Sequence, residues 1–412
     1  MYKSREEFIS ALGVSKMPEL FGARFDETMA QYEREGVFFL EDRFIADIQK
    51  KYNIFKEKYD FVMSSAKRVR ENEFLARYSL LLYHMLCDKE SDALLYLKEA
   101  PKAAEEPLKT DYEMAAFFTH LALTPRVVEY YRAHRVPDEI ICDTLNDYLE
   151  GAIFVCNDYQ HRDGYEVMRS FNWNQLFTNC KCIRIGVLNF EMSSTMPTKN
   201  IKAFKNKNGE YKILINGRDI SASGYISGTA GHEDVSYHAE ITEGDEYFEG
   251  YVVDTLNARA TGEKIRLDKR EWTLALSPED NVIDVHIPIG VDLSVQNMET
   301  AYKRAVKVFA ECFPEFKPKA FVCFSWLMDP QLRDMLSPES KIIAFQSKFL
   351  RFPMKTNGDG ACIFLFKNPL SKKYDIPNLA ENTSLQRKVK RHYLDGKYIY
   401  DHGGVFFEYL ED

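Results

Sequence analysis

In the first 160 residues, apolar positions recur every three or four residues, the spacing of one face of an α-helix. One such stripe consists of Phe74, Tyr78, Leu81, Leu82 and Met85. A helix start is indicated at Pro137, because Asp138 and Glu139 follow it in the first turn, where acidic side chains favour the helix dipole. The pattern therefore predicts a helical N-terminal domain over residues 1–162.

The pattern changes after residue 162. Over residues 200–280, turn signals such as Asn208-Gly209 and Asn216-Gly217 separate short runs rich in Tyr, Ile and Val, which predicts antiparallel hairpins. Helix and strand patterns then alternate to the end of the chain. We predict an α+β fold, in which the helical domain is followed by a domain over residues 163–412 with a mixed, largely antiparallel sheet and flanking helices.

The expected elements of the second domain can be placed along the chain. Strands are expected over residues 182–191, 282–287, 320–324, 341–345 and 361–366. Helices are expected over residues 173–178, 294–313, 329–336 and 384–394. A final hairpin is expected from residues 397–400 and 405–409.

Composition limits the classes of function. The 412 residues are 45% hydrophobic and 14% aromatic, so both domains can bury a core. The net charge of −9 argues against nucleic acid or an anionic membrane surface as the main partner. No apolar run reaches the ~18 residues that cross a bilayer, and the N-terminus lacks a signal-peptide core. The cysteines, mostly in apolar surroundings, are typical of buried thiols in a reducing compartment. We expect a cytoplasmic protein.

The segment of residues 282–313 is the first candidate for chemistry. A strand leads to Gly290 and then to a helix for which Ser294 is a good N-cap. Free backbone N–H groups and the positive end of the helix dipole point the same way at such a start, and they can hold an anion. The alternative is an ordinary connection between a strand and a helix, where a small residue is needed.

Pro288 adds a second feature to this segment. A proline at a strand end cannot donate a hydrogen bond to a neighbouring strand, so the strand is expected to splay from its neighbour there. The exposed backbone groups could then pair with an extended ligand. His286 lies on the same face of the strand as Pro288 and is a candidate general base. The alternative is a half-buried structural histidine.

The strand over residues 320–324 ends beside the same expected site. Ser325 could hold a polar substrate group or the leaving thiolate, and Trp326 could form a wall of the site. Cys323 fits a core thiol better than a nucleophile. Asp329 and Pro330 fit the N-cap and first position of a helix.

Metal and nucleotide motifs point to no further site. His232, Glu233, Asp234, His238 and Glu240 do not have the spacing of a closed metal site, so no metal is expected. The chain also has no Gly-x-Ser-x-Gly elbow, no Walker loop and no Gly-x-Gly-x-x-Gly motif.

Several motifs in order resemble a family of bacterial acyltransferases, in which an N-acyltransferase N-terminal helical domain precedes a GNAT-like C-terminal domain. The residues that carry the resemblance are the runs 182–188, 286–293, 323–332 and 343–346, together with Thr383-Ser384-Leu385-Gln386-Arg387 and Gly403-Gly404. The likeness covers about residues 10–410.

The resemblance implies a GNAT-like fold and acyl-CoA or acetyl-CoA as co-substrate, with no tightly bound cofactor. In such folds a splayed strand pairs with the pantetheine arm, and the following loop and helix start bind the pyrophosphate. The implied donor-binding residues are Ile287, Ile289, Gly290, Val291, Leu293 and Ser294. The implied catalytic residues are His286, Ser325 and Glu191, and the substrate-binding residues are Trp326 and Gln346.

The function that the resemblance implies is transfer of an acyl group from acyl-CoA to the amine of a small acceptor. GNAT enzymes usually carry Arg or Gln and two glycines in the phosphate loop, whereas this chain has only Gly290 and then Asp292, whose charge opposes a phosphate. A non-catalytic ligand-binding protein on the same fold is therefore an alternative. A hydrolase that uses Cys323 or Ser325 is a third. An unpaired sheet edge would also be consistent with a homodimer.

Overall fold

The computed structural model describes residues 5–12, 19–87, 108–158, 171–288, 290–366 and 375–410. The chain divides into two compact units, Met1–Arg184 and Ile185–Asp412. The boundary expected between residues 162 and 163 lies outside the described residues. Among the described residues, no helix is both long enough and apolar enough to cross a membrane.

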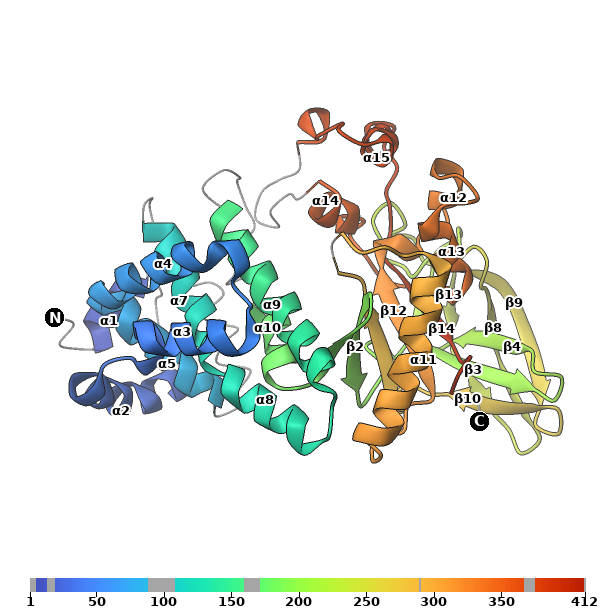
Figure 1. Cartoon of the computed structure of the whole chain (residues 1–412). Coiled ribbons are helices and arrows are strands. Elements are labelled where there is room, and N and C mark those ends of the chain that lie inside the picture. The colour runs from blue at the N-terminus through green and yellow to red at the C-terminus, as the bar shows by residue number, and fades with distance from the viewer. Residues whose placement is uncertain are drawn as a thin grey trace. The chain divides into compact units, whose positions relative to one another are not determined.

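The first unit is helical, as its periodicity predicts (Figure 1). Its helices are α1 (Arg5–Leu12), α2 (Glu19–Glu35), α3 (Asp42–Tyr52), α4 (Tyr59–Glu71), α5 (Glu73–Cys87), α7 (Leu108–Ala122), α8 (Thr124–Ala133), α9 (Asp138–Asp158) and α10 (Phe171–Thr178). Short 3₁₀ turns lie at Phe38–Leu40 and Lys56–Lys58. Helices α5 and α7 are buried along most of their length, and the hydroxyls of Tyr78 and Tyr112 are 2.7 Å apart between them. These two helices form the centre of the core.

The second unit contains two larger sheets and a small one. The first sheet has the order β1-β2-β11-β12-β14-β13, and the division between the units falls within β1. Its strands are β1 (Cys182–Ile185), β2 (Leu188–Ser193), β11 (Val282–His286), β12 (Ala320–Ser325), β14 (His402–Phe406) and β13 (Leu350–Pro353). Strands β11 and β12 are parallel, and the pairs β2–β11, β12–β14 and β13–β14 are antiparallel.

The second sheet has the order β10-β3-β4-β8-β7, and β9 also pairs with β8. Its strands are β3 (Ile201–Asn206), β4 (Tyr211–Ile215), β7 (Thr242–Glu243), β8 (Tyr247–Asp254), β9 (Arg259–Asp268) and β10 (Trp272–Leu276). The small sheet pairs β5 (Arg218–Ile220) with β6 (Tyr237–Ala239). The antiparallel hairpins expected over residues 200–280 are thus present.

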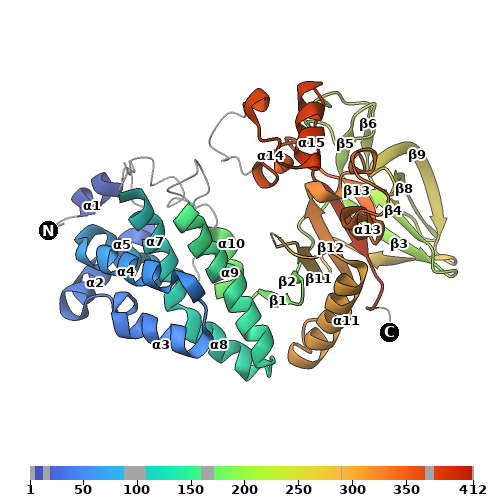
Figure 2. The ribbon, with the colours of Figure 1, turned by 45° about the horizontal axis from the view of Figure 1, so that its top comes forward.

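The two faces of the first sheet are covered differently (Figures 1 and 2). Helix α11 (Val295–Cys312) lies on one face, where Tyr302 contacts the rings of Phe321 and Phe406. On the other face, Val322 and Val405 share a buried apolar cluster with residues of β3 and β4. The first sheet is therefore a middle layer between a helix and a second sheet.

A third group of elements follows β12. It consists of a 3₁₀ turn at Trp326–Met328, α12 (Leu332–Met335), α13 (Lys341–Ser347), α14 (Gly360–Phe364), a 3₁₀ turn at Ile376–Asn378 and α15 (Ser384–Leu394). Several of them share a separate buried cluster with Trp326, Leu332 and Val389. Helix α15 begins with a capping box between Thr383 and Gln386, a sequence signal that made its position predictable.

Several of the predicted elements are wrong. Residues 341–345 lie in helix α13, and residues 361–364 of the expected strand 361–366 lie in helix α14, because a short apolar run alone does not distinguish a strand from a buried helix. Residues 397–400 form no strand, and β14 pairs with β12 and β13 instead of closing a local hairpin. The strand expected over residues 182–191 is two strands, separated at Gly186, whose φ is +61°.

Candidate functional site

Strand β11 separates from its parallel neighbour part-way along its length. Its antiparallel pairing with β2 continues to His286. Its parallel pairing with β12 ends at Asp284 and Val322, although β12 continues to Ser325 in its pairing with β14. The disruption that Pro288 predicts is therefore present, and it begins at Val285. Such a gap leaves two facing strand edges that do not pair with each other.

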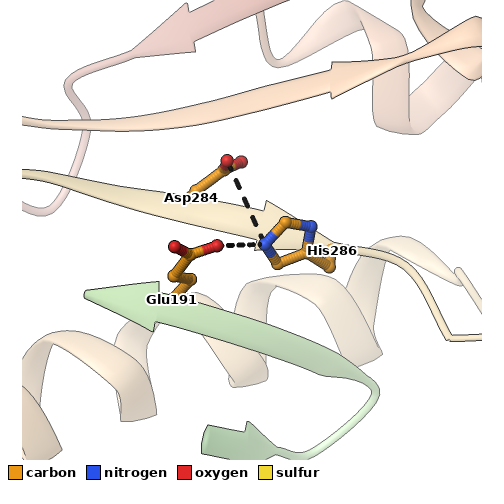
Figure 3. A group of neighbouring side chains, drawn as sticks. All are labelled: Glu191, Asp284 and His286. Carbon is orange, nitrogen blue, oxygen red and sulfur yellow. Dashed lines mark hydrogen bonds and ion pairs between the residues drawn. The ribbon is translucent and has the colours of Figure 1, made fainter. Parts of the chain in front are cut away.

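Three ionisable side chains meet where the two strands separate (Figure 3). Asp284 and His286 lie on the same face of β11, because side chains alternate along a strand. Glu191 on β2 is the register partner of Asp284 and so points to that face as well. His286 Nε2 is 2.9 Å from Glu191 Oε2 and 4.0 Å from Asp284 Oδ2. The second ring nitrogen of His286 points away from both carboxylates.

The three groups differ in exposure. The side chains of His286 and Glu191 are 25% and 19% exposed, whereas Asp284 is buried and its Oδ1 has no hydrogen-bond partner. A ligand could therefore reach the imidazole, while Asp284 lies behind it. The sequence predicts His286 and Glu191 as site residues but not Asp284, whose only signal is a charged residue in an otherwise apolar strand.

Burial and charge set the proton affinity of this cluster. Burial raises the pKa of Asp284 to about 7, and the negative charge of Glu191 adds to the rise, while His286 opposes it. Burial lowers the pKa of His286, but its hydrogen bond to Glu191 and the two carboxylate charges outweigh burial, so the pKa is raised overall. The cluster can therefore exchange protons near neutral pH, as acid–base chemistry requires.

We expect Asp284→Asn to stabilise the protein more at pH 8 than at pH 5. The raised pKa of Asp284 means that the folded state keeps a proton that the unfolded chain releases between about pH 4 and pH 7, so the buried carboxyl lowers stability as pH rises through that window. Above both pKa values, the loss of stability is at most about 1.4 kcal/mol for each unit by which the pKa of Asp284 in the folded state exceeds its pKa in the unfolded chain. Thermal unfolding at the two pH values measures it. Asp245→Asn in an exposed turn is the control, and equal effects of Asp284→Asn at both pH values would contradict the assignment.

The loop after β11 leads to the N-terminus of α11. Ile289 lies outside the described residues. Gly290 has a φ of +79°, which favours glycine, and nothing lies within 4 Å of the position a Cβ would take. Val291 is half-buried and Leu293 is buried. Ser294 occupies the expected N-cap position.

The cap of α11 differs from the expectation. The side chain of Ser294 makes no capping bond, and its backbone N–H donates instead to Asp292 Oδ1 at 3.0 Å. Lys341 Nζ lies 2.6 Å from the same carboxylate oxygen, and these contacts lower the pKa of Asp292. Asp292 therefore does not present an uncompensated charge, because Lys341 offsets it. A phosphate at this helix end would meet a lysine as well as a carboxylate.

The other predicted residues lie at the ends of β11 and β12 or just after them. Ser325 is half-buried, and its Oγ accepts a hydrogen bond from the backbone N–H of Leu327 at 3.1 Å. Ile287 follows β11 and is half-buried. Trp326 is buried in the cluster with Leu332 and Val389. The Ser325 hydroxyl acts as an acceptor in this bond, so its proton can still be donated. Trp326 mainly packs in the hydrophobic core.

The side-chain amide of Gln346 is buried and forms hydrogen bonds within the protein. Its Nε2 donates to the carbonyls of Leu327 and Asp329 at 2.6 and 2.9 Å, and its Oε1 accepts from Arg351 at 3.0 Å. These bonds connect α13 to the segment after β12. The predicted contact of Gln346 with a substrate has no support in this arrangement.

Two further expectations concern Cys323 and Asp329. Cys323 is buried, and burial raises the pKa of its thiol well above the ordinary value, which opposes a role as nucleophile. Asp329 is not an N-cap: it is buried, and its carboxylate accepts hydrogen bonds from the backbone N–H groups of Tyr400 and Gln331. Residue Gln331 occupies the N-cap position of α12 instead.

The histidines of the hairpin region are separate from each other. His232 Nδ1 is 2.7 Å from the hydroxyl of Ser223, and His238 Nδ1 is 2.7 Å from a carboxylate oxygen of Asp219. In the described part of the chain, one group of three metal-ligand side chains lies close enough to share an ion, namely Glu191, Asp284 and His286, whose ligand atoms lie within 4.8 Å of one another.

Comparison with known families gives two adjoining matches. Residues 62–180 match the N-acyltransferase N-terminal domain, and residues 182–406 match the GNAT-like C-terminal domain, which alone covers more than half of the chain. Comparison with curated proteins gives no significant match.

Solved structures of acyltransferases resemble the whole chain. One, in complex with decanoyl-CoA and teicoplanin, is 15% identical, covers 97% of this chain and 98% of its own, and gives a TM-score of 0.59. Another, in complex with CoA and 10C-teicoplanin, is 15% identical, covers 98% of each chain and gives a TM-score of 0.60. A mutant in complex with octanoyl-CoA is 15% identical, covers 98% of each chain and gives a TM-score of 0.59. At this identity the likeness establishes a shared fold.

Proposed function

Because this chain belongs to the family of acyltransferases with a GNAT-like C-terminal domain, we propose that it transfers an acyl group from acyl-CoA to the amine of a small acceptor. The observation that carries the proposal is the position of the His286–Glu191 pair, at the point where β11 and β12 cease to pair. A proton acceptor beside a gap between two strands is what direct acyl transfer needs.

The gap supports the donor side of the proposal. Beyond Asp284 and Val322 the facing edges of β11 and β12 are not paired with each other, so the amides of a pantetheine arm can pair with backbone groups there. The pyrophosphate would then reach the start of α11, where backbone N–H groups favour negative charge and Lys341 offsets the charge of Asp292. The acyl-CoA complexes of the structural neighbours make octanoyl-CoA and decanoyl-CoA suitable donors to test beside acetyl-CoA.

The chemistry follows from the proton affinities of the cluster. The amine nitrogen attacks the thioester carbonyl and forms the C–N bond while neutral His286 accepts a proton from the amine. The C–S bond then breaks, and the CoA thiolate takes a proton, for which the Ser325 hydroxyl is the candidate donor. Water returns a proton to Ser325, and the imidazolium of His286 releases its proton to solvent, so both residues are restored. Glu191 holds the imidazole in place and stabilises the imidazolium that forms. The products are an amide and free CoA.

Binding of the donor is the first expected result. We expect CoA, octanoyl-CoA or decanoyl-CoA to raise the melting temperature, because a ligand that binds only the folded state stabilises it by about 2.7 kcal/mol at a hundredfold excess over Kd. Thermal unfolding with increasing CoA measures the effect, and AMP at the same concentrations is the control for weak anion binding. The absence of a shift at millimolar CoA and acyl-CoA would contradict the proposed donor site.

A further inference from the structure

The second unit holds a cavity of about 500 Å³ that shares no lining residue with the Glu191–Asp284–His286 cluster. It lies between the turn that joins β8 to β9 and the segment that follows β12. Charged and polar side chains line it, among them Tyr225, the arginines Arg259 and Arg333, and the aspartates Asp254, Asp329 and Asp334. A cavity of this size can hold a small metabolite.

Arg259 is held in the wall by an aromatic ring. Its guanidinium carbon lies 4.4 Å from the centre of the Tyr225 ring, and its Nη2 donates to the Tyr225 hydroxyl at 2.6 Å. It follows Ala258, a buried non-glycine residue with a φ of +52°, which costs energy and fixes the start of β9. The position of Arg259 is thus set by packing, and its hydrogen bond to Tyr225 uses one of the five N–H donors of the guanidinium.

Arg333 on α12 contacts both sides of the cavity. Its Nε donates to the carbonyl of Pro330 at 3.2 Å, and its Nη2 donates to Asn257 Oδ1 at 2.9 Å across to the β8–β9 turn. In the described part of the chain, neither Arg259 nor Arg333 forms an ion pair with a carboxylate. Both arginines therefore keep N–H donors that no carboxylate of the described residues binds.

Two of the three carboxylates of the cavity accept hydrogen bonds from other groups of the protein. Asp254 accepts hydrogen bonds from the backbone N–H groups of Leu256 and Asn257 and from the Asn257 amide. Asp329 is buried and accepts from Tyr400 and Gln331. These carboxylates keep their negative charge, which acts on Arg333 and Arg259, but their oxygens have little capacity left to coordinate a cation.

The positive field of the arginines reaches neighbouring groups. Burial lowers the pKa of His402 to about 3, and the charges of Arg259 and Arg351 add to that fall. Burial and then the charge of Arg259 also lower the pKa of His232. These shifts favour the neutral form of both histidines, so the positive charge at the cavity comes from the arginines.

We infer that this cavity binds a small molecule with an oxyanion group, a carboxylate or a phosphate, between Arg259 and Arg333. Planar guanidinium groups present paired N–H donors that match the two oxygens of such a group. The inference does not depend on acyl transfer, because none of the residues that carry it belongs to the His286 cluster.

Calorimetric titration of the full chain tests the inference. The probes are inorganic phosphate and ribose 5-phosphate in one arm and succinate and citrate in the other, at constant ionic strength set with sodium chloride. We expect saturable binding with a stoichiometry of one in at least one arm, and the arm that binds more tightly identifies the oxyanion. The absence of saturable binding in both arms would overturn the inference.

Variants locate the binding. Arg259→Gln and Arg333→Gln should each weaken binding at least tenfold, because each removes one charged donor. Arg266→Gln is the matched control: Arg266 lies on the same strand and stacks on Tyr247 at 3.9 Å, but it is paired with Glu249, so binding should change less than twofold. If Arg259→Gln does not fold, the test uses Arg333→Gln and Arg259→Lys. Lysine keeps the positive charge at position 259 but lacks the paired N–H donors of a guanidinium. Unchanged affinity in the folded variants would overturn the inference.

Discussion

Replacement of His286 by Asn is expected to lower the rate of acyl transfer by about 10²–10⁴-fold, the usual contribution of a positioned general base. The amide of Asn cannot accept the proton of the attacking amine. Stabilisation by CoA should persist, because the side chain is a base in this account and does not hold the donor. Release of free thiol from acyl-CoA in the presence of an amine measures the rate.

His238→Asn is the matched control for this variant. His238 forms a similar pair with Asp219 at 2.7 Å, but both side chains are more than half exposed in the small β5–β6 sheet. Its replacement should change the rate less than twofold. A His286→Asn variant that binds CoA and retains most of the activity would remove His286 from the mechanism.

The pH dependence of the rate gives a further outcome of the same account. Neutral imidazole is the base, so the rate should fall as pH falls through the pKa of His286, which lies above its ordinary value. Glu191 contributes to that rise through its hydrogen bond and its charge. Glu191→Gln should therefore move the acidic limb of the profile to lower pH, whereas a purely structural role of Glu191 would leave the limb in place.

Replacement of Phe321 by Ala is expected to cost about 3–5 kcal/mol of stability, the usual range for a buried Phe. Phe321 on β12 is fully buried, and its ring centre lies 4.8 Å from that of Phe406, 5.3 Å from that of Tyr302 and 6.1 Å from that of Phe190. The ring thus connects three strands of the first sheet to α11. Its loss leaves a cavity that these rings cannot fill.

Thermal unfolding measures this change, and the melting temperature of the second unit should fall by about 6–20 °C. Phe364→Ala is the control, because Phe364 on α14 is 54% exposed and its truncation should change stability by less than about 0.5 kcal/mol. Equal effects of the two variants would contradict the position of Phe321 at the centre of the sheet–helix interface.

Local sequence signals predicted much of the second unit. The β-branched run of β11 and the amphipathic spacing of α11 place both elements nearly where the structure has them. Pro288 predicts the loss of pairing with β12, because a proline cannot donate to a neighbouring strand. The helical first unit was predictable for the same reason, since one apolar face repeats every three or four residues.

Features that depend on distant residues were not predictable in the same way. Strand β13 was missed, because its partner β14 lies about fifty residues further along the chain. The register that sets Glu191 opposite Asp284 joins positions more than ninety residues apart, so the sequence could name Glu191 as a candidate but could not place it. Arg259 and Arg333 likewise approach one cavity from separate segments and carry no local signal.

The most direct test of the proposed function is a measurement of product. The full chain is incubated with decanoyl-CoA, octanoyl-CoA or acetyl-CoA and a panel of small amines, and both free thiol and acylated amine are quantified by mass spectrometry. The account predicts equal amounts of free CoA and amide, formed only when donor and amine are both present and greatly reduced by His286→Asn. Saturable binding of acyl-CoA without formation of any amide would contradict it and would favour a non-catalytic ligand-binding protein.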